Sequence, residues 1–221
     1  MGEACRLCGS TDTRLFFEGA ARAHDREFHH CASAHAGCDL VFVPDRFLLS
    51  PEDERERYLL HENDPGDEGY RAYLSNLLDE IAPLLPPGAE GLDYGCGEPA
   101  VLVMMLREQG FAVEGWDLFF SPDATPLDRA YDFIACSETA EHFREPLTEF
   151  ERLNGLLRLG GVLGVMTQML PDWSEFGDWH YRFDATHISF YSARTMRWIA
   201  ERFGWSVSFP REHVTVFRKP A

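Results

Sequence analysis

A glycine-rich junction between a predicted strand and a predicted helix constrains the fold of this chain more than any other feature. The strand is predicted over residues 91–94 and runs directly into Gly95-Cys96-Gly97. The helix that follows carries apolar side chains on one face, at 101, 102, 105 and 106, and Gly110 ends it. Glycines at such a junction let the backbone approach a ligand where a side chain would clash. The segment therefore predicts a ligand-binding loop at the end of a strand.

Strands and helices alternate along much of the chain. Apolar runs predict strands over 111–116, 131–136, 162–167, 205–209 and 213–217, and helical periodicity predicts helices over 70–85, 147–157 and 192–203. Ser50 as N-cap and Pro51 at the first helical position predict a short charged helix over 51–62, and Ser192 is the predicted cap of the last helix. Such alternation is typical of a parallel sheet with helices on both faces. The last two strands are joined too tightly for a helical crossover, so we expect them to form an antiparallel hairpin.

Acidic residues around the glycine loop indicate the ligand. Asp93 lies two residues before Gly95, Glu98 lies inside the loop, and Asp117 ends the next strand, 20 residues beyond Gly97. The glycines alone also fit a dinucleotide-binding fingerprint. A pyrophosphate, however, would bind amide donors with no carboxylate beside them. S-adenosylmethionine carries no phosphate and its sulfonium is positively charged, so the acidic residues favour it over a nicotinamide cofactor. A nicotinamide cofactor and a tight turn that binds no ligand are the two alternatives.

The same residues resemble the class I S-adenosylmethionine-dependent methyltransferases. Residues 92–97 match their acid-x-Gly-x-Gly motif, and Asp117 matches the acid that binds the ribose hydroxyls. Residues 138–143 are similar to the Glu-x-x-Glu-His segment of the ubiquinone-type branch, and residues 158–163 resemble the turn before strand five. The resemblance covers roughly residues 70–221. It implies these cofactor contacts: Asp93, Gly95, Gly97, Asp117, Leu118, Glu138 and His142.

One interval departs from the family pattern. Only 14 residues separate Asp117 from Asp132, where the family usually fits a helix, a strand and a loop. We therefore expect either a very short third strand or a missing helix. The adenine-side contacts that the family draws from this interval are left open, with Phe119, Phe120 and Asp123 as the local candidates.

Residues 179–187 are similar to a signature of a bacterial subgroup whose members also begin with a four-cysteine element. His180 and His187 follow strand five, where this fold builds its acceptor side, so they are candidates for removing a proton from the acceptor. A purely structural role is the alternative for both. Aromatic residues crowd the same region, and they suit either a flat acceptor pocket or core packing: Trp173, Phe176, Trp179, Tyr181, Phe183, Phe190 and Tyr191.

Four of the six cysteines fall within the first 38 residues. Cys5 and Cys8 have the spacing of a zinc knuckle, and we expect Cys31 and Cys38 to complete a structural, zinc-ribbon-like site. His35, His29 or His30 could replace one thiolate, and four buried reduced thiols without metal are the alternative. A segment this short has too little core to fold without a metal or a partner, which favours zinc.

Charge narrows the range of partners. The formal net charge of −17 and the lack of a basic stripe argue against nucleic acid. No apolar run approaches the ~20 residues that cross a bilayer, and the N-terminus lacks the order of a secretory signal, so we expect a cytoplasmic protein without membrane partners.

Together these features predict three regions: a zinc-ribbon-like element over 1–45, a helical linker and cap over 46–88, and an S-adenosylmethionine-binding domain over 89–221. The domain is expected to be a doubly wound, Rossmann-like α/β fold with a seven-stranded, mostly parallel sheet. The predicted activity is methyl transfer to a small-molecule acceptor, aromatic compounds included. The rivals are a nicotinamide-dependent oxidoreductase and a scaffold that binds S-adenosylmethionine without turnover.

Overall fold

The computed structural model describes residues 3–21, 24–32, 37–60 and 63–221. Its contacts divide the chain into two compact units. The cysteine unit comprises residues 1–60, 141–150 and 168–199, and the sheet unit comprises 61–140, 151–167 and 200–221. His35 lies outside the described residues. No helix in the described part of the chain has the length and apolar character needed to span a bilayer.

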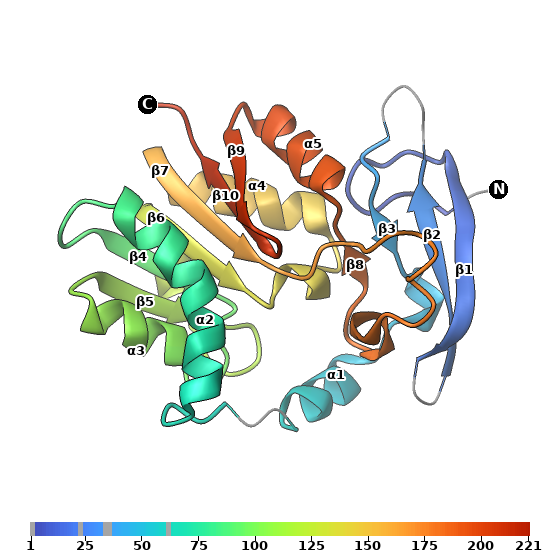
Figure 1. Cartoon of the computed structure of the whole chain (residues 1–221), viewed down its shortest axis with the longest axis horizontal. Coiled ribbons are helices and arrows are strands. Elements are labelled where there is room, and N and C mark those ends of the chain that lie inside the picture. Colours follow the sequence, from blue (N-terminus) through green and yellow to red (C-terminus); the bar gives the residue numbers. More distant parts are fainter. Residues whose placement is uncertain (1–2, 22–23, 33–36, 61–62) are drawn as a thin grey trace. The chain divides into compact units, whose positions relative to one another are not determined.

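The sheet unit is built on a mixed sheet in the order β5-β4-β6-β7-β10-β9 (Figure 1). Its strands are β4 (Glu90–Tyr94), β5 (Ala112–Trp116), β6 (Tyr131–Ser137), β7 (Leu157–Met166), β9 (Ser206–Arg211) and β10 (Val214–Arg218). The first four pair in parallel, whereas β10 pairs antiparallel with both β7 and β9. The α/β fold and the C-terminal hairpin predicted from the sequence are confirmed.

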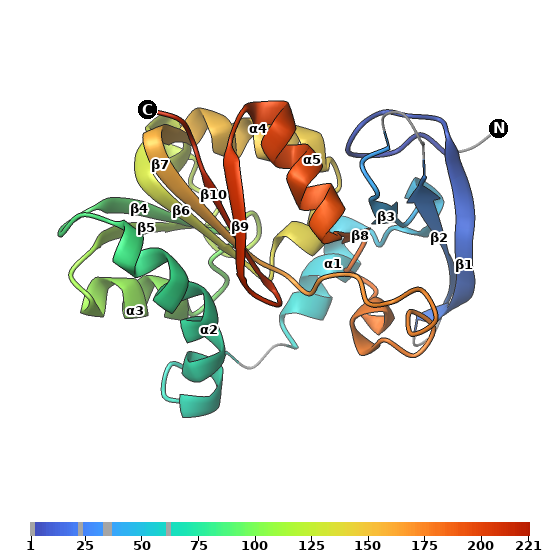
Figure 2. The same cartoon turned by 45° about the horizontal axis from the view of Figure 1, so that its top comes forward.

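Helices cover the sheet as the apolar periodicity predicts. Helix α2 (Glu68–Ile81) begins at Asp67, whose side chain accepts hydrogen bonds from the amides of Gly69 and Tyr70. Its buried face, together with α3 (Val101–Glu108), packs on one face of the sheet (Figure 2). Helices α4 (Pro146–Leu156) and α5 (Ala193–Phe203) follow β6 and β8 in the chain. The amide of Thr195 donates to Ser192 Oγ, so the predicted cap of α5 forms.

The predicted count of seven strands is wrong, because the described sheet has six. Between β5 and β6, Asp117 forms an isolated antiparallel bridge with Ser121, and a short 3₁₀ helix follows over Thr125–Asp128. The residues between Asp117 and Tyr131 form no further strand. The physical reason is length. A crossover with its own helix and strand needs more than the residues available here. Strand β5 is therefore one edge of the sheet.

The cysteine unit has a smaller sheet in the order β1-β2-β3-β8. The strands are β1 (Thr13–Ala21), β2 (His24–Cys31), β3 (Val41–Phe42) and β8 (Ser189–Phe190), and the unit also contains α1 (Pro51–Tyr58). Pro51 begins α1 and Ser50 caps it, as predicted from the sequence. An apolar core around Phe28, Phe176 and Phe190 holds the sheet against the 176–190 segment.

Candidate functional site

The predicted glycine loop lies where parallel strands end. The chain passes from β4 to β5 on one side and later to β6 on the other, so the order of strands switches direction at β4. Ligands of open α/β sheets bind outside the carboxyl ends of the strands at such a switch point. Gly95 follows β4, Asp117 follows β5 and Glu138 follows β6, so three of the predicted cofactor contacts share this edge.

Asp117, which directly follows β5, also holds the glycine loop through hydrogen bonds. Its Oδ2 accepts a hydrogen bond from the amide of Gly97 at 3.0 Å, and its Oδ1 accepts from the amides of Phe119 and Phe120 at 2.8 and 3.0 Å. Leu118, next in the chain, is 64% exposed. The carboxylate is thus held at the mouth of the loop beside an exposed apolar side chain.

Asp93 is a buried carboxyl group in β4, two residues before Gly95. Burial, together with the smaller effect of the negative charge of Asp117, raises the pKa of Asp93 to about 7. A cation placed beside the loop would favour the ionised form of Asp93. The pair is therefore suited to a positively charged ligand, as the sequence predicted from these two acids.

Gly95 has a backbone angle φ of +83°, and its Cα faces Thr139, whose Oγ1 donates to the Gly95 carbonyl at 3.3 Å. A Cβ at this position would lie 2.3 Å from the Thr139 side chain. We expect Gly95→Ala to lower the free energy of unfolding by about 1–3 kcal/mol through overpacking, in addition to backbone strain. Denaturant titration measures this loss.

Gly110→Ala is the matched control for Gly95→Ala. Gly110 has a φ of +89° and no described atom within 4 Å of its ideal Cβ, so only backbone strain is added there. Equal losses of stability in the two variants would show that the contact between Gly95 and Thr139 does not constrain the loop.

His142, His180 and His187 belong to the cysteine unit. His142 donates from Nδ1 to the carbonyl of Thr186 at 3.0 Å, and His187 donates from Nδ1 to the carbonyl of Tyr181 at 2.7 Å. The two imidazole rings lie 4.9 Å apart between their centroids. Burial lowers the pKa of His187 to about 3, with His142 acting in the same direction, so His187 is a neutral imidazole at neutral pH.

His180 is exposed and differs from His187 in its partner. Trp179 Nε1 donates to Gln168 Oε1 at 3.2 Å, which turns the amide nitrogen of Gln168 toward His180 Nε2, also at 3.2 Å. Because an amide nitrogen only donates, His180 Nε2 carries a lone pair rather than a proton. His180 is therefore in the form that can accept a proton.

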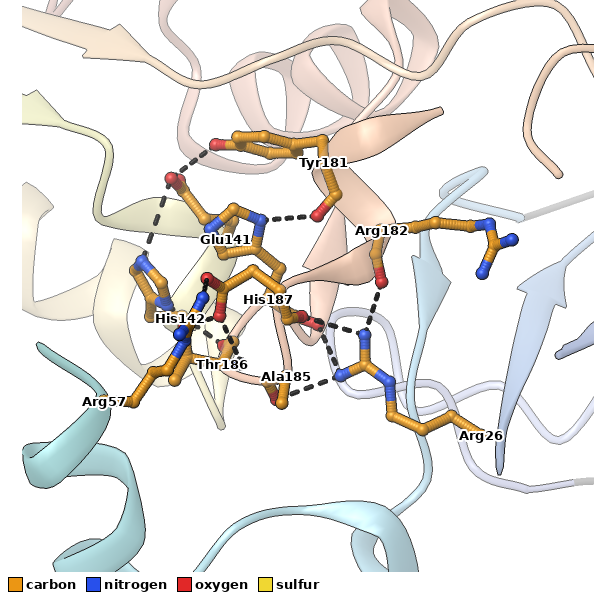
Figure 3. Close-up of polar contacts among 10 residues, drawn as sticks. Arg26, Arg57, Glu141, His142, Tyr181, Arg182, Ala185, Thr186 and His187 are labelled. Carbon is orange, nitrogen blue, oxygen red and sulfur yellow. Dashed lines mark hydrogen bonds and ion pairs between the residues drawn. The ribbon is translucent and has the colours of Figure 1, made fainter. Parts of the chain in front are cut away.

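Side chains that the sequence analysis did not single out hold the 182–187 turn in place (Figure 3). The buried guanidinium of Arg26 donates to the carbonyls of Arg182, Asp184, Ala185 and His187, at 2.7 to 3.2 Å. Burial alone would raise the pKa of Asp184, but hydrogen bonds from Thr186 and Arg57 outweigh it and hold that pKa below its usual value. The sequence around Arg26 did not indicate this role, because the backbone carbonyls that accept its hydrogen bonds lie more than 150 residues away in the chain.

The aromatic residues of the 173–191 segment differ in burial, which bears on whether they pack in the core or could line an acceptor pocket. Phe176 and Phe190 are buried in the core of the cysteine unit, where Phe176 contacts Phe28 edge-on and Phe190 contacts it in a tilted arrangement. Trp173 is half exposed. Core packing therefore accounts for the buried phenylalanines, and these rings are not free to form a pocket wall.

Four thiols meet in the cysteine unit. The Sγ atoms of Cys5, Cys8, Cys31 and Cys38 all lie within 4.8 Å of one another, with Cys5–Cys38 and Cys8–Cys31 each at 3.4 Å. Hydrogen bonding to Cys31 raises the pKa of Cys38 and lowers that of Cys8. Sulfur ligands in a closed set of four match a tetrahedral structural zinc site.

Comparisons with known proteins add to this geometry. A family model described as a methyltransferase domain matches residues 67–208. Among curated proteins, none matches the chain significantly. Similar solved structures include 1,6-didemethyltoxoflavin-N1-methyltransferase from Burkholderia thailandensis, with a TM-score of 0.54 and 15% identity over 87% of this chain and 99% of that one. Another is magnesium protoporphyrin IX methyltransferase from Synechocystis PCC 6803, with a TM-score of 0.51 and 16% identity over 79% and 97%.

Proposed function

The chain belongs to the family of methyltransferase domains, and on this premise we propose that it transfers the methyl group of S-adenosylmethionine to a small-molecule acceptor. The observation that carries the proposal is the meeting of the glycine loop with Asp93 and Asp117 at the ends of β4 and β5. Two carboxylates at this edge favour a cationic ligand over a pyrophosphate. Family membership also favours methyl transfer over the nicotinamide-dependent alternative.

The acceptor class is supported by the similar structures. Both carry bound S-adenosylhomocysteine, and their names give small molecules, magnesium protoporphyrin IX and 1,6-didemethyltoxoflavin, as the methyl acceptors. The net charge of −17 disfavours a nucleic-acid acceptor. We therefore propose a small molecule as the acceptor. Residues 138–143 and 179–187 are the features that support a place in the ubiquinone-type branch and its four-cysteine subgroup.

S-adenosylmethionine supplies an electrophilic methyl carbon, and the residues of this chain bind it and prepare the acceptor. We assign ribose binding to Asp117, the charged methionine end to Asp93, and backbone contacts to Gly95 and Gly97. Leu118 offers an exposed apolar surface to the adenine ring. The acceptor atom forms its bond to the methyl carbon as the sulfur–carbon bond breaks, so binding and orientation provide most of the catalysis.

Proton removal is assigned to His180, since its Nε2 faces the amide nitrogen of Gln168 and therefore carries a lone pair. His187 is a weaker base because its pKa is lowered to about 3, and we assign it a hydrogen-bond contact to the acceptor. Glu138 and His142 stay proposed cofactor-side residues. For the four thiols we propose one structural zinc ion, because the donor set is closed and leaves no position for substrate.

Two measurements test this function. Calorimetric titration should show binding of S-adenosylhomocysteine and none of NAD. Transfer of labelled methyl groups to candidate metabolites should then occur, and His180→Gln should lower kcat while leaving cofactor affinity unchanged. Binding of the nucleoside without any turnover would instead support a non-catalytic scaffold, and binding of NAD would contradict the proposal.

Cofactor binding should release a proton near neutral pH. The buried Asp93 is protonated below its pKa of about 7, and a cationic ligand favours its ionised form. Affinity for S-adenosylmethionine should therefore rise about tenfold from pH 6 to pH 8 and level off above that. Calorimetry in two buffers of different ionisation enthalpy measures the proton. Asp93→Asn should remove the release, whereas the exposed Asp123→Asn should retain it.

A further inference from the structure

A second group of metal-binding side chains lies in the cysteine unit. Glu141, His142 and His187 each present one ligand atom, and these three atoms lie within 4.8 Å of one another. Figure 3 shows the carboxylate of Glu141 between the hydroxyl of Tyr181 and the ring of His142. Glu141 is fully buried, and its Oε1 is 3.9 Å from His142 Nε2.

The hydrogen bonds of the two histidines decide which ring nitrogen can bind a ligand. Both Nδ1 atoms face backbone carbonyls, that of Thr186 for His142 and that of Tyr181 for His187. A carbonyl only accepts, so each Nδ1 carries the proton and the lone pair of the neutral ring is on Nε2. An Nδ1–H bound to a carbonyl is the arrangement that orients metal-binding histidines in proteins.

The backbone holds these side chains on a fixed framework. The amide of Ile188 donates to the carbonyl of Glu141 at 2.9 Å, and Ser189 Oγ donates to the carbonyl of Phe143 at 3.0 Å. Arg26 clamps the opposite side of the 182–187 turn through four carbonyls. The 141–143 and 186–189 segments are therefore joined by hydrogen bonds that do not involve the three donor atoms.

We propose that Glu141, His142 and His187 bind one divalent transition-metal ion, through a carboxylate oxygen and the two Nε2 atoms. A buried carboxylate beside two imidazole lone pairs is an electron-rich set that a cation stabilises. Imidazole ligands favour ions such as Zn²⁺, Co²⁺ or Fe²⁺ over Mg²⁺ and Ca²⁺, which prefer oxygen. Tyr181 donates its hydroxyl to Glu141 and so orients the carboxylate.

Three protein ligands leave at least one coordination position open, unlike the four thiols. An oxygen or nitrogen atom of a bound small molecule can take that position. The site goes beyond the proposed methyl transfer, and it gives the lone pair of His187 to a metal ion in place of the acceptor contact assigned above.

Co²⁺ binding to the zinc-loaded full chain tests the proposal. With the thiols occupied by zinc, calorimetric titration should show one equivalent of Co²⁺ per chain. His142→Gln and His187→Gln should each weaken that binding more than about tenfold, since each loses a direct ligand. His180→Gln is the matched control, because His180 lies in the same unit outside the group, and its Co²⁺ affinity should equal that of the wild type.

Tyr181→Phe removes only the hydroxyl that orients Glu141, so it keeps the test valid if the histidine variants fail to fold. Its Co²⁺ affinity should fall about tenfold. No binding by the zinc-loaded wild type, or equal affinity in the wild type and Tyr181→Phe, would overturn the proposal. Titration of the wild type, His187→Gln and Tyr181→Phe with S-adenosylhomocysteine reports on the proposed function separately, since Asp93 and Asp117 lie outside this group; His142→Gln is left out of that comparison because His142 is also a proposed cofactor-side residue.

Discussion

Asp117→Ala is expected to weaken binding of S-adenosylhomocysteine by about a hundredfold or more. The proposed role of this carboxylate is to accept hydrogen bonds from both ribose hydroxyls, and a hydrogen bond to a charged group contributes about 1.5–3 kcal/mol. The same carboxylate accepts from the amides of Gly97, Phe119 and Phe120, so its loss also releases the loop. Calorimetric titration measures the affinity, and thermal unfolding monitors the fold.

Asp79→Ala is the control for Asp117→Ala. Asp79 lies on α2 in the sheet unit, is exposed, and its carboxylate pairs with Arg211 at 3.3 Å. Its loss removes a surface ion pair and leaves the glycine loop and its acids in place. Affinity should be unchanged in this variant. If Asp117→Ala also retained full affinity, the ribose assignment would be wrong.

Cys8→Ser is expected to abolish stoichiometric zinc binding and to unfold the cysteine unit at a lower temperature than in the wild type. A serine hydroxyl is not a thiolate ligand, and binding of a structural zinc ion contributes directly to folding. Around the site, the amides of Cys5 and Cys31 donate to the carbonyls of Ser10 and Leu40 and so hold the loops that carry the thiols. Atomic absorption of the purified protein measures the metal.

Cys96→Ser provides the comparison, because Cys96 is a half-buried thiol in the sheet unit and outside the cluster. Its zinc content should equal that of the wild type. A full complement of zinc in Cys8→Ser would contradict the four-thiol site. If the wild type held no zinc and Cys8→Ser were as stable as the wild type, the alternative of four packed, reduced thiols would be favoured.

Local structure was predictable wherever neighbouring residues determine it. Ser50 with Pro51, and Ser192 before α5, were predicted as helix starts, because a capping side chain bonds to amides only a few residues away. The alternation of apolar runs likewise predicted the parallel strands and the final hairpin. The strand count failed, because the family pattern supplied a seventh strand where the interval after Asp117 was too short for one.

The two candidate sites differ in how much of them a sequence can reveal. Asp93, Gly95 and Asp117 each stand at the end of a strand, and parallel strands bring such ends to one edge, so their meeting follows from the fold class. Glu141, His142 and His187 come from segments more than forty residues apart, outside any regular pairing. Their segments are joined by hydrogen bonds from Ile188 and Ser189 to distant carbonyls, which no periodicity or spacing indicates.

The sequence by itself therefore determined the α/β class, the glycine loop with its acids and the grouping of four cysteines, because periodicity and short spacings express them. Only the tertiary structure decided the number of strands, the burial of Phe176 and Phe190, and which nitrogen of each histidine carries a proton. The reason is physical. Burial and hydrogen bonds to distant carbonyls depend on which segments lie side by side in the folded chain, and local sequence patterns do not indicate those contacts.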